Sequence, residues 1–200
     1  MPDSNITKRA LSAAMKELMA ERPMEKIRIG DIVERCNMNR QSFYYHFRDK
    51  YDLVNWIFYT EFFADIQRSF DKPGWELIEK MCQFFYENRT FYTNALQVRG
   101  QNSFSEYFNE VMHPLILARF DDIFADDPDR DFYATFLADS IRVTITRWLL
   151  EGAKLPPERF IELLKKAVTG LAYKIVMEEE QDHSRSNLQD DTSANSNQKV

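Results

Sequence analysis

The stretch Asn39-Arg-Gln-Ser-Phe-Tyr-Tyr-His-Phe-Arg-Asp-Lys50 concentrates hydrogen-bonding and aromatic side chains within the length of one short helix. The segment before it, Ile29-Gly-Asp-Ile-Val-Glu-Arg-Cys36, has apolar residues at positions 29, 32, 33 and 36, the spacing of a single helical face. Asn37-Met38-Asn39 lies between the two segments and favours a tight reversal. Two short helices joined in this way form a helix-turn-helix, and the side chains of the second predict a helix that reads DNA.

The same segment resembles the DNA-binding domain of the tetracycline-repressor (TetR) family of bacterial regulators. The residues that agree with the family pattern are Phe43, Tyr44, His46, Phe47, Lys50 and Leu53. At positions 36 to 39, Cys-Asn-Met-Asn stands where the family usually has Ala-Gly-Val-Ser. The run from residue 40 to residue 58 looks most like the branch that includes regulators of dihydroxyacetone kinase operons.

Length and composition fit a small all-α protein. The chain has 200 residues, of which 44% are hydrophobic and 14% aromatic, which is ample for a packed core. No apolar run approaches the roughly 20 residues of a membrane span, and the first residues lack the features of a secretory signal, so we expect a cytoplasmic protein. Cys36 and Cys82 have no neighbouring Cys or His at ligand spacing, and we interpret them as buried thiols in a reducing compartment.

A net charge of -6 by itself argues against binding to nucleic acid, but the charge is unevenly distributed along the chain. Residues 1–50 contain ten Lys or Arg and seven Asp or Glu, a balance of +3, whereas residues 51–200 carry -9. The basic segment, residues 1–50, is therefore the one that contains the predicted helix-turn-helix. An acidic remainder keeps the rest of the molecule away from a duplex and favours a defined orientation.

Periodicity and punctuation predict about nine helices and no strand. The resemblance implies an N-terminal three-helix DNA-binding domain with the helix-turn-helix, at 1–50, and a C-terminal helical ligand and dimerisation domain, at 51–180, with a helix at 50–70 connecting them. Residues 181–200 are too polar to bury enough surface for folding, which predicts a disordered tail. The expected helices are 5–21, 28–36, 40–46, 50–70, 74–87, 89–97, 104–124, 130–151 and 157–179.

Within the reading segment, Arg40 and Gln41 are the leading candidates for base contacts. Arg pairs with guanine and Gln with adenine through two hydrogen bonds. By resemblance, Tyr44, Tyr45, His46 and Lys50 lie along the phosphates, whereas Phe43 and Phe47 face the core. The full set of candidate DNA-binding residues is Arg28, Asn39, Arg40, Gln41, Ser42, Tyr44, Tyr45, His46 and Lys50.

Two of these positions depart from the family. Arg28 stands where a Thr or Ser usually caps the second helix, and it is either a solvated side chain or a cation that contacts DNA. Gln41 stands where Gly is common, so it adds a base-reading side chain and also crowds the backbone. Asn37 replaces a Gly, and Asn tolerates the left-handed conformation that a turn here needs.

Aromatic residues are dense between positions 84 and 124, and ordinary core packing explains most of them. An effector pocket needs polar groups that converge amid apolar walls, and an Arg among them favours an anionic or oxygen-rich ligand. The candidate effector-binding residues are Asn94, Gln97, Arg99, Tyr107, Arg142 and Arg147.

The resemblance implies a homodimer that packs the last two helices, 130–151 and 157–179, into a four-helix bundle across a two-fold axis. These helices carry more apolar surface than one small core needs. The candidate interface residues are Phe136, Ile141, Ile145, Trp148, Phe160, Leu164, Val168 and Leu171.

Taken together, the sequence predicts a sequence-specific, DNA-binding transcriptional regulator that binds a near-palindromic operator, most simply a ligand-responsive dimeric repressor. An activator on the same scaffold and a helical protein-interaction module are the alternatives. His46, His113 and His183 lack the spacing of a metal site or of a nucleophile and base pair, so we expect no enzymatic activity, no metal and no cofactor. The expected partners are double-stranded DNA, a second copy of the chain and a small-molecule effector.

Overall fold

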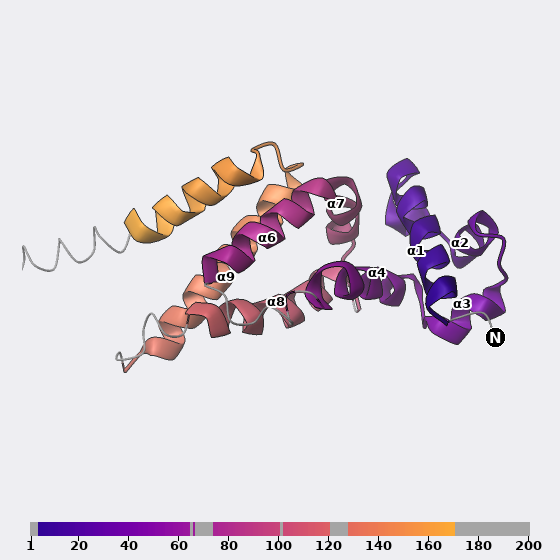
Figure 1. The fold of residues 1–200 in the computed structure, drawn as a ribbon, viewed down its shortest axis with the longest axis horizontal. Helices are drawn as coiled ribbons and strands as arrows, with labels where there is room; N and C mark the ends of the chain where they lie inside the picture. Colours follow the sequence, from indigo (N-terminus) through magenta and orange to yellow (C-terminus); the bar gives the residue numbers. More distant parts are fainter. Residues whose placement is uncertain (1–3, 65, 67–73, 101, 121–127, 171–200) are drawn as a thin grey trace, which may run out of the picture. The chain divides into compact units, whose positions relative to one another are not determined.

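The computed structural model describes residues 4–64, 66, 74–100, 102–120 and 128–170, and these residues form helices and no strands. Figure 1 shows the arrangement of the elements. The described residues up to Pro157 form one compact unit, and those from Glu158 to residue 170 belong to a second. In the described ranges, no helix combines the length and the apolar run that crossing a bilayer requires.

The first four helices form the head of the molecule, α1 (Ser4–Glu21), α2 (Ile29–Arg35), α3 (Arg40–His46) and α4 (Lys50–Phe58), with a 3₁₀ turn at Met24–Lys26 that the sequence did not predict. Leu11 and Met15 of α1, Ile32 of α2, Phe43 of α3 and Leu53 of α4 have no measurable exposure, so all four helices share one core. Arg35 fixes α2 against α1, because its guanidinium contacts Glu17 at 3.2 Å and Glu21 at 2.8 Å. The side-chain hydrogen bond from Arg35 lowers the pKa of the Glu21 carboxyl.

Helix α4 ends earlier than the predicted 50–70. At Tyr59–Phe63 the chain continues as a π-helical segment, η2, in which the backbone hydrogen bonds shift by one residue. The remainder of the predicted helix, apart from Ala64 and Ile66, lies outside the described residues.

The body consists of α6 (Gly74–Glu87), α7 (Arg89–Gln97), α8 (Phe104–Phe120) and α9 (Arg130–Leu150). The bounds of α6 and α7 agree with the sequence, and the helix predicted at 157–179 is described over 157–170. The end predicted for α8, at residues 121–124, lies outside the described residues. Pro114 lies inside α8, which continues past it.

Phe58, the last residue of α4, is the centre of the body's aromatic core. Its ring stacks on Phe85 with an interplanar angle of 4°, and the ring centroids of Phe104 and Phe108 lie 5.4 Å and 5.9 Å away. All four rings are at most 1% exposed. Most of the dense aromatic residues are therefore core, as the sequence predicted, and α4 joins the head to this core through its own last residue.

Candidate nucleic-acid interface

The turn between α2 and α3 depends on Asn37. Its φ of 54° lies in the left-handed region, which confirms that this position needs a residue tolerant of that conformation. The reversal lets the backbone N–H of Met38 donate to the carbonyl of Val33 at 2.8 Å. The two helices are thereby joined by a short, hydrogen-bonded connection.

Asn39 begins α3 as its N-cap. Its side-chain oxygen accepts hydrogen bonds from the Ser42 backbone N–H at 2.8 Å and from the Ser42 hydroxyl at 3.1 Å. This satisfies a backbone donor that the start of a helix leaves unpaired. Asn39 and Ser42, both candidates for DNA contact, therefore already stabilise the helix that carries the other candidates.

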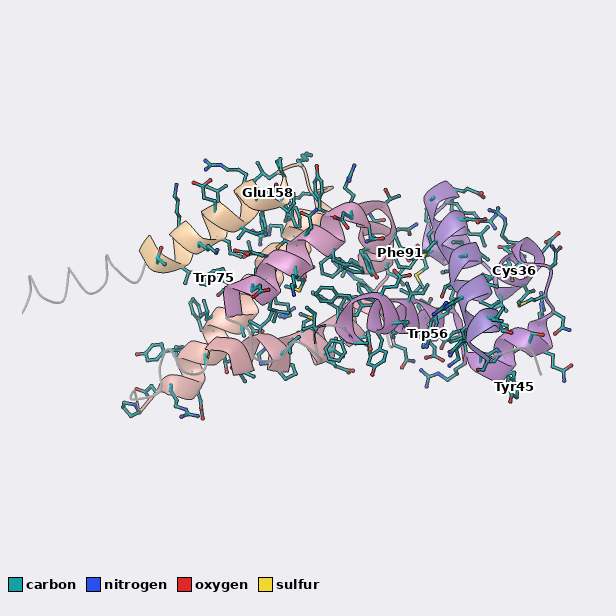
Figure 2. All side chains as sticks on the ribbon, viewed as in Figure 1. Cys36, Tyr45, Trp56, Trp75, Phe91 and Glu158 are labelled. Atoms are coloured by element: carbon teal, nitrogen blue, oxygen red, sulfur yellow. The ribbon has the colours of Figure 1, made fainter. Side chains whose placement is uncertain are left out.

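Helix α3 has two opposite faces. Phe43 and Phe47 are buried, as predicted, and fix the helix in the head core. Gln41 is exposed on the other face, where Tyr44 is 57% and Tyr45 82% exposed. Figure 2 shows Tyr45 pointing away from the head. The buried side of α3 holds the helix in the head, and the exposed aromatic and amide groups on its other side form a surface that can bind a partner.

Half-buried His46 packs edge-on against Tyr45, with ring centroids 4.9 Å apart. Its imidazole therefore restricts the position of the Tyr45 ring. His46 supports an exposed aromatic group in this structure.

Two arginines flank the same surface. A Cβ at Gly30, near the start of α2, would lie only 3.1 Å from a terminal nitrogen of Arg40, so the absence of a side chain there leaves room for the Arg40 guanidinium. Arg28 is the N-cap of α2, and its backbone N–H donates to the Asp31 carboxylate at 2.8 Å. Because Asp31 helps to cap the helix, the exposed side chain of Arg28 is not needed for that purpose.

Lys50 has a different environment from the one expected for a phosphate contact. Its ammonium group donates to the backbone carbonyls of Met24 at 2.8 Å, Glu25 at 3.2 Å and Ile27 at 2.9 Å. Burial lowers the pKa of Lys50, and the charge of Glu25 opposes that effect. A lysine whose donors are satisfied by three carbonyls holds the 3₁₀ turn against α4, which is a structural role.

The candidate effector residues lie in different places. Asn94 and Gln97 line a cavity of about 420 Å³ beside the end of α1, whereas Tyr107 lines another cavity, between α4 and α8. Arg99 and Arg147 are exposed, and Arg142 contacts Asp139 at 3.2 Å.

Asn94 is itself a structural residue. Its amide nitrogen donates to the carbonyls of Met19 and Arg22 at 2.9 Å and 3.0 Å, and its oxygen accepts from the Met24 N–H at 2.7 Å. Helix α7 is thereby fixed to the end of α1.

The candidate interface residues divide by burial. Phe136 is 64% exposed, but Ile141 and Ile145 have no measurable exposure and Trp148 has 5%. A side chain that is already buried in one chain cannot contact a second chain without repacking, so Ile141, Ile145 and Trp148 are interior positions here. Phe160 and Leu164 are 8% exposed, Val168 is half-buried, and Leu171 lies outside the described residues.

Sequence reasoning placed Phe136 at the dimer interface but missed that it shares one exposed apolar face of α9 with Val143 and Leu150, and it missed the acidic lining of the cavity that contains Tyr107. Phe132, Phe136 and Val143 recur at intervals of four and seven residues, a helical repeat that could have identified this face. Glu106 and Glu110 flank Tyr107 at helical spacing, but only the folded chain places α4 opposite them.

A short helix held by its own cap after a tight turn, with one face buried and a polar, aromatic face exposed, defines a helix-turn-helix protein of the kind that regulates transcription. Residues 10–57 match the family described as bacterial regulatory proteins, tetR family, and residues 75–170 match a transcriptional regulator C-terminal region of the same family. The chain belongs to the TetR family.

Two bacterial relatives share sequence with the chain. The HTH-type dhaKLM operon transcriptional activator DhaS of Lactococcus lactis subsp. lactis (strain IL1403) is 30% identical over 110 residues, which cover 54% of this chain and 57% of the relative. The uncharacterized HTH-type transcriptional regulator YxbF of Bacillus subtilis (strain 168) is 23% identical, over 85% of this chain and 50% of the relative. The chain thus spans about half the length of these relatives.

Solved structures share the fold. The dihydroxyacetone kinase operon activator DhaS has a TM-score of 0.63 and 22% identity, covering 86% of this chain and 97% of its own. NalD, the secondary repressor of the MexAB-OprM multidrug efflux pump in Pseudomonas aeruginosa, has a TM-score of 0.61 and 18% identity, covering 82% and 94%. The matched families and these neighbours are transcriptional regulators and not enzymes.

Proposed function

We propose that the chain binds DNA sequence-specifically as a homodimer, places α3 of each copy in a major groove, and represses transcription until an effector releases it. The single observation that carries this proposal is the exposed face of α3, which lies opposite the buried Phe43. Gln41 and Arg40 read base edges there, and Tyr44 and Tyr45 contact phosphates on either side. The outward-facing Arg28 supplies a further phosphate contact.

The exposed groups are suited to these tasks. Arg40 is held near α2 beside Gly30 and can present its guanidinium to guanine, and exposed Gln41 can present its amide to adenine. Each bidentate contact discriminates against a wrong base by about 1–3 kcal/mol. Because one short helix reads few bases, a second copy on the same DNA is needed for useful specificity.

Helix α9 supports the dimer. It buries Ala134, Ile141 and Ile145 on one side and exposes Phe132, Phe136, Val143 and Leu150 on the other. A helix that is apolar on two faces packs on two sides, and within the described part of residues 1–157 only one of these faces is buried. We assign the other face to contact with a second copy, which sets the spacing of the two reading helices.

Repression is the simpler consequence of this binding. A dimer that occupies a promoter excludes RNA polymerase by overlap alone, whereas activation also requires a surface that contacts the polymerase. The proteins that resemble this chain include one named an activator and one named a repressor, so both signs of regulation occur among proteins of this fold.

The proposal is tested by selecting bound fragments from bacterial genomic DNA at about 0.15 M salt with the native protein, the double variant Gln41→Ala, Tyr44→Ala, and Lys154→Ala. Lys154 is exposed and lies in the body, so its variant is the matched surface control. We expect the native protein and Lys154→Ala to enrich the same near-palindrome and the double variant to enrich none. Equal enrichment by all three proteins would show that α3 does not read DNA.

Transcription from an enriched promoter with purified RNA polymerase then gives the sign of regulation. We expect the added protein to lower transcript yield. An increase would replace the repressor by an activator on the same scaffold. No enrichment by a folded native protein would instead favour the protein-interaction module.

A further inference from the structure

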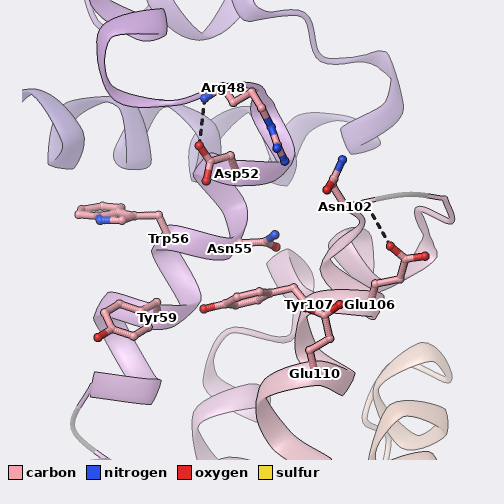
Figure 3. Close-up of a pocket in the computed structure, with 9 residues that line it drawn as sticks. All are labelled: Arg48, Asp52, Asn55, Trp56, Tyr59, Asn102, Glu106, Tyr107 and Glu110. Carbon is pink, nitrogen blue, oxygen red and sulfur yellow. Dashed lines mark hydrogen bonds between the residues drawn. The ribbon is translucent and has the colours of Figure 1, made fainter.

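A cavity of about 600 Å³ lies between the first part of α4 and the first half of α8, inside the unit formed by residues 1–157 (Figure 3). Its volume is in the range of small-molecule sites. It borders the aromatic core, since the ring centroids of Tyr107 and Phe58 lie 6.3 Å apart, but polar as well as aromatic side chains line it. Three aromatic residues and three carboxylates dominate its walls, namely Trp56, Tyr59, Tyr107, Asp52, Glu106 and Glu110.

The charge of the cavity is negative. Among the described residues that line it, three carboxylates face one cation, Arg48, whose Nε lies 3.5 Å from Asp49, a further carboxylate. A second cation, Lys8, lies at the edge of the site, with its Nζ 5.5 Å from the centroid of the Trp56 ring. Asp52 accepts the Arg48 backbone N–H with one oxygen at 2.9 Å, and Glu106 accepts the Asn102 N–H with one oxygen at 2.9 Å. Each of these carboxylates therefore retains an oxygen that accepts from a ligand. An anionic ligand would meet net repulsion here.

The aromatic residues of the cavity also favour a cationic ligand over an anionic one. Tyr107 extends from α8 towards α4, with its hydroxyl near the side of Tyr59 (Figure 3). Burial raises the pKa of Tyr107, and the neighbouring Tyr59 and Glu110 raise it further, so the phenol stays neutral. Neutral electron-rich rings beside carboxylates attract an organic ammonium group.

Asn55 adds a requirement for a hydrogen-bond donor. Its side-chain oxygen is buried and has no hydrogen-bond partner among the residues that the structure describes, and the amide extends from α4 towards α8 (Figure 3). A buried acceptor without a partner costs free energy that a donor from a ligand recovers. An N–H of a protonated amine supplies both the donor and the positive charge.

We infer that this cavity binds a protonated organic amine with an apolar body, and that the amine is the effector. The second part of this inference rests on the proposed function. Arg48 and Asp52 lie just beyond the end of α3, while Glu106 and Glu110 belong to the body, so an occupant contacts both sides of the junction between head and body. A ligand that prefers one position of the head shifts the population towards that position and so changes operator affinity.

Three probes with one phenyl scaffold separate charge from shape: phenethylamine, 2-phenylethanol and phenylacetate, which are cationic, neutral and anionic at pH 7.5. Isothermal titration calorimetry of the full chain should show binding of phenethylamine, roughly tenfold weaker binding of 2-phenylethanol, and no binding of phenylacetate. Tighter binding of either 2-phenylethanol or phenylacetate, or equal binding of all three, would overturn the inference.

Two variants locate the binding site. Glu110→Gln removes one exposed charge of the cavity at constant shape and should weaken phenethylamine binding about threefold, whereas Glu158→Gln removes an exposed charge elsewhere and should leave it unchanged. Equal binding to both variants would place the ligand outside this cavity.

Operator affinity, measured with and without saturating phenethylamine, tests the regulatory part separately. A change in affinity in the native protein but not in Glu110→Gln supports the assignment as effector site. An unchanged affinity, with calorimetric binding intact, overturns the effector role alone. A protein that binds phenethylamine but no DNA overturns the proposed function and leaves the amine site standing.

Discussion

The side-chain oxygen of Asn94 accepts the backbone N–H of Met24 at 2.7 Å across 70 residues of sequence. Its amide nitrogen also donates to two carbonyls at the end of α1, so one residue of α7 satisfies three backbone groups of the head. The attachment of head to body thus includes a polar contact as well as the apolar core around Phe58.

Asn94→Ala should reduce the free energy of unfolding by about 2–4 kcal/mol, because three part-buried backbone groups lose their partner together. Urea unfolding at fixed pH measures the loss. Gln97→Ala, at an exposed position on the same helix, serves as the control and should change stability by less than about 0.5 kcal/mol. Similar stability of both variants would mean that the Asn94 hydrogen bonds are exchanged for water without cost.

Lys50→Met should destabilise the head without changing the salt dependence of DNA binding. The substitution removes the hydrogen-bond donor of three backbone carbonyls. Because the Lys50 ammonium group is bound to these carbonyls and not to a phosphate, its loss should not change the number of counterions released from DNA. The slope of the logarithm of operator affinity against the logarithm of salt concentration should match that of the native protein. A slope smaller by about 1 would instead identify Lys50 as a phosphate contact.

Phe136→Glu should give a monomer of native stability, because Phe136 is largely exposed in the single chain and its replacement charges the proposed dimer face. Light scattering after size exclusion measures the oligomeric state. Ile141→Ala is the matched comparison on the interior side of α9, where it should cost about 2–5 kcal/mol of stability. A Phe136→Glu protein that remains dimeric would assign the interface to another surface.

Cys82 should make stability fall as the pH rises above about 9. Burial raises the pKa of its thiol to about 12 in the folded chain, whereas an unfolded cysteine ionises near pH 8.5. Between these values the unfolded state binds fewer protons than the folded one, so stability decreases by up to about 1.4 kcal/mol per pH unit. Urea unfolding between pH 8 and 11 should show a steeper decline in the native protein than in Cys82→Ala, and equal slopes would refute the assignment.

Much of the local structure follows from short-range chemistry. The predicted helices at 40–46, 74–87 and 89–97 agree with the structure because a polar cap or a break lies next to each of them in the sequence. The burial of Phe43 also follows from helical spacing. Phe47 is the extended C-cap after α3, and its ring is buried against Trp56, with ring centroids 5.7 Å apart. The 3₁₀ turn at Met24–Lys26 was missed because its stability comes from Lys50 and Asn94, which lie far along the chain.

The sequence by itself determined the family, the all-α fold and the bounds of α3, the proposed reading helix, because helical periodicity, capping residues and turn residues act between neighbours in the chain. The tertiary structure alone decided which candidate side chains are available to a partner and which already contact the rest of the chain. Lys50 and Asn94 are occupied by backbone groups, Ile141 and Ile145 are interior, and the acidic cavity exists only where α8 faces α4. These outcomes depend on contacts between residues distant in sequence, which no local pattern encodes.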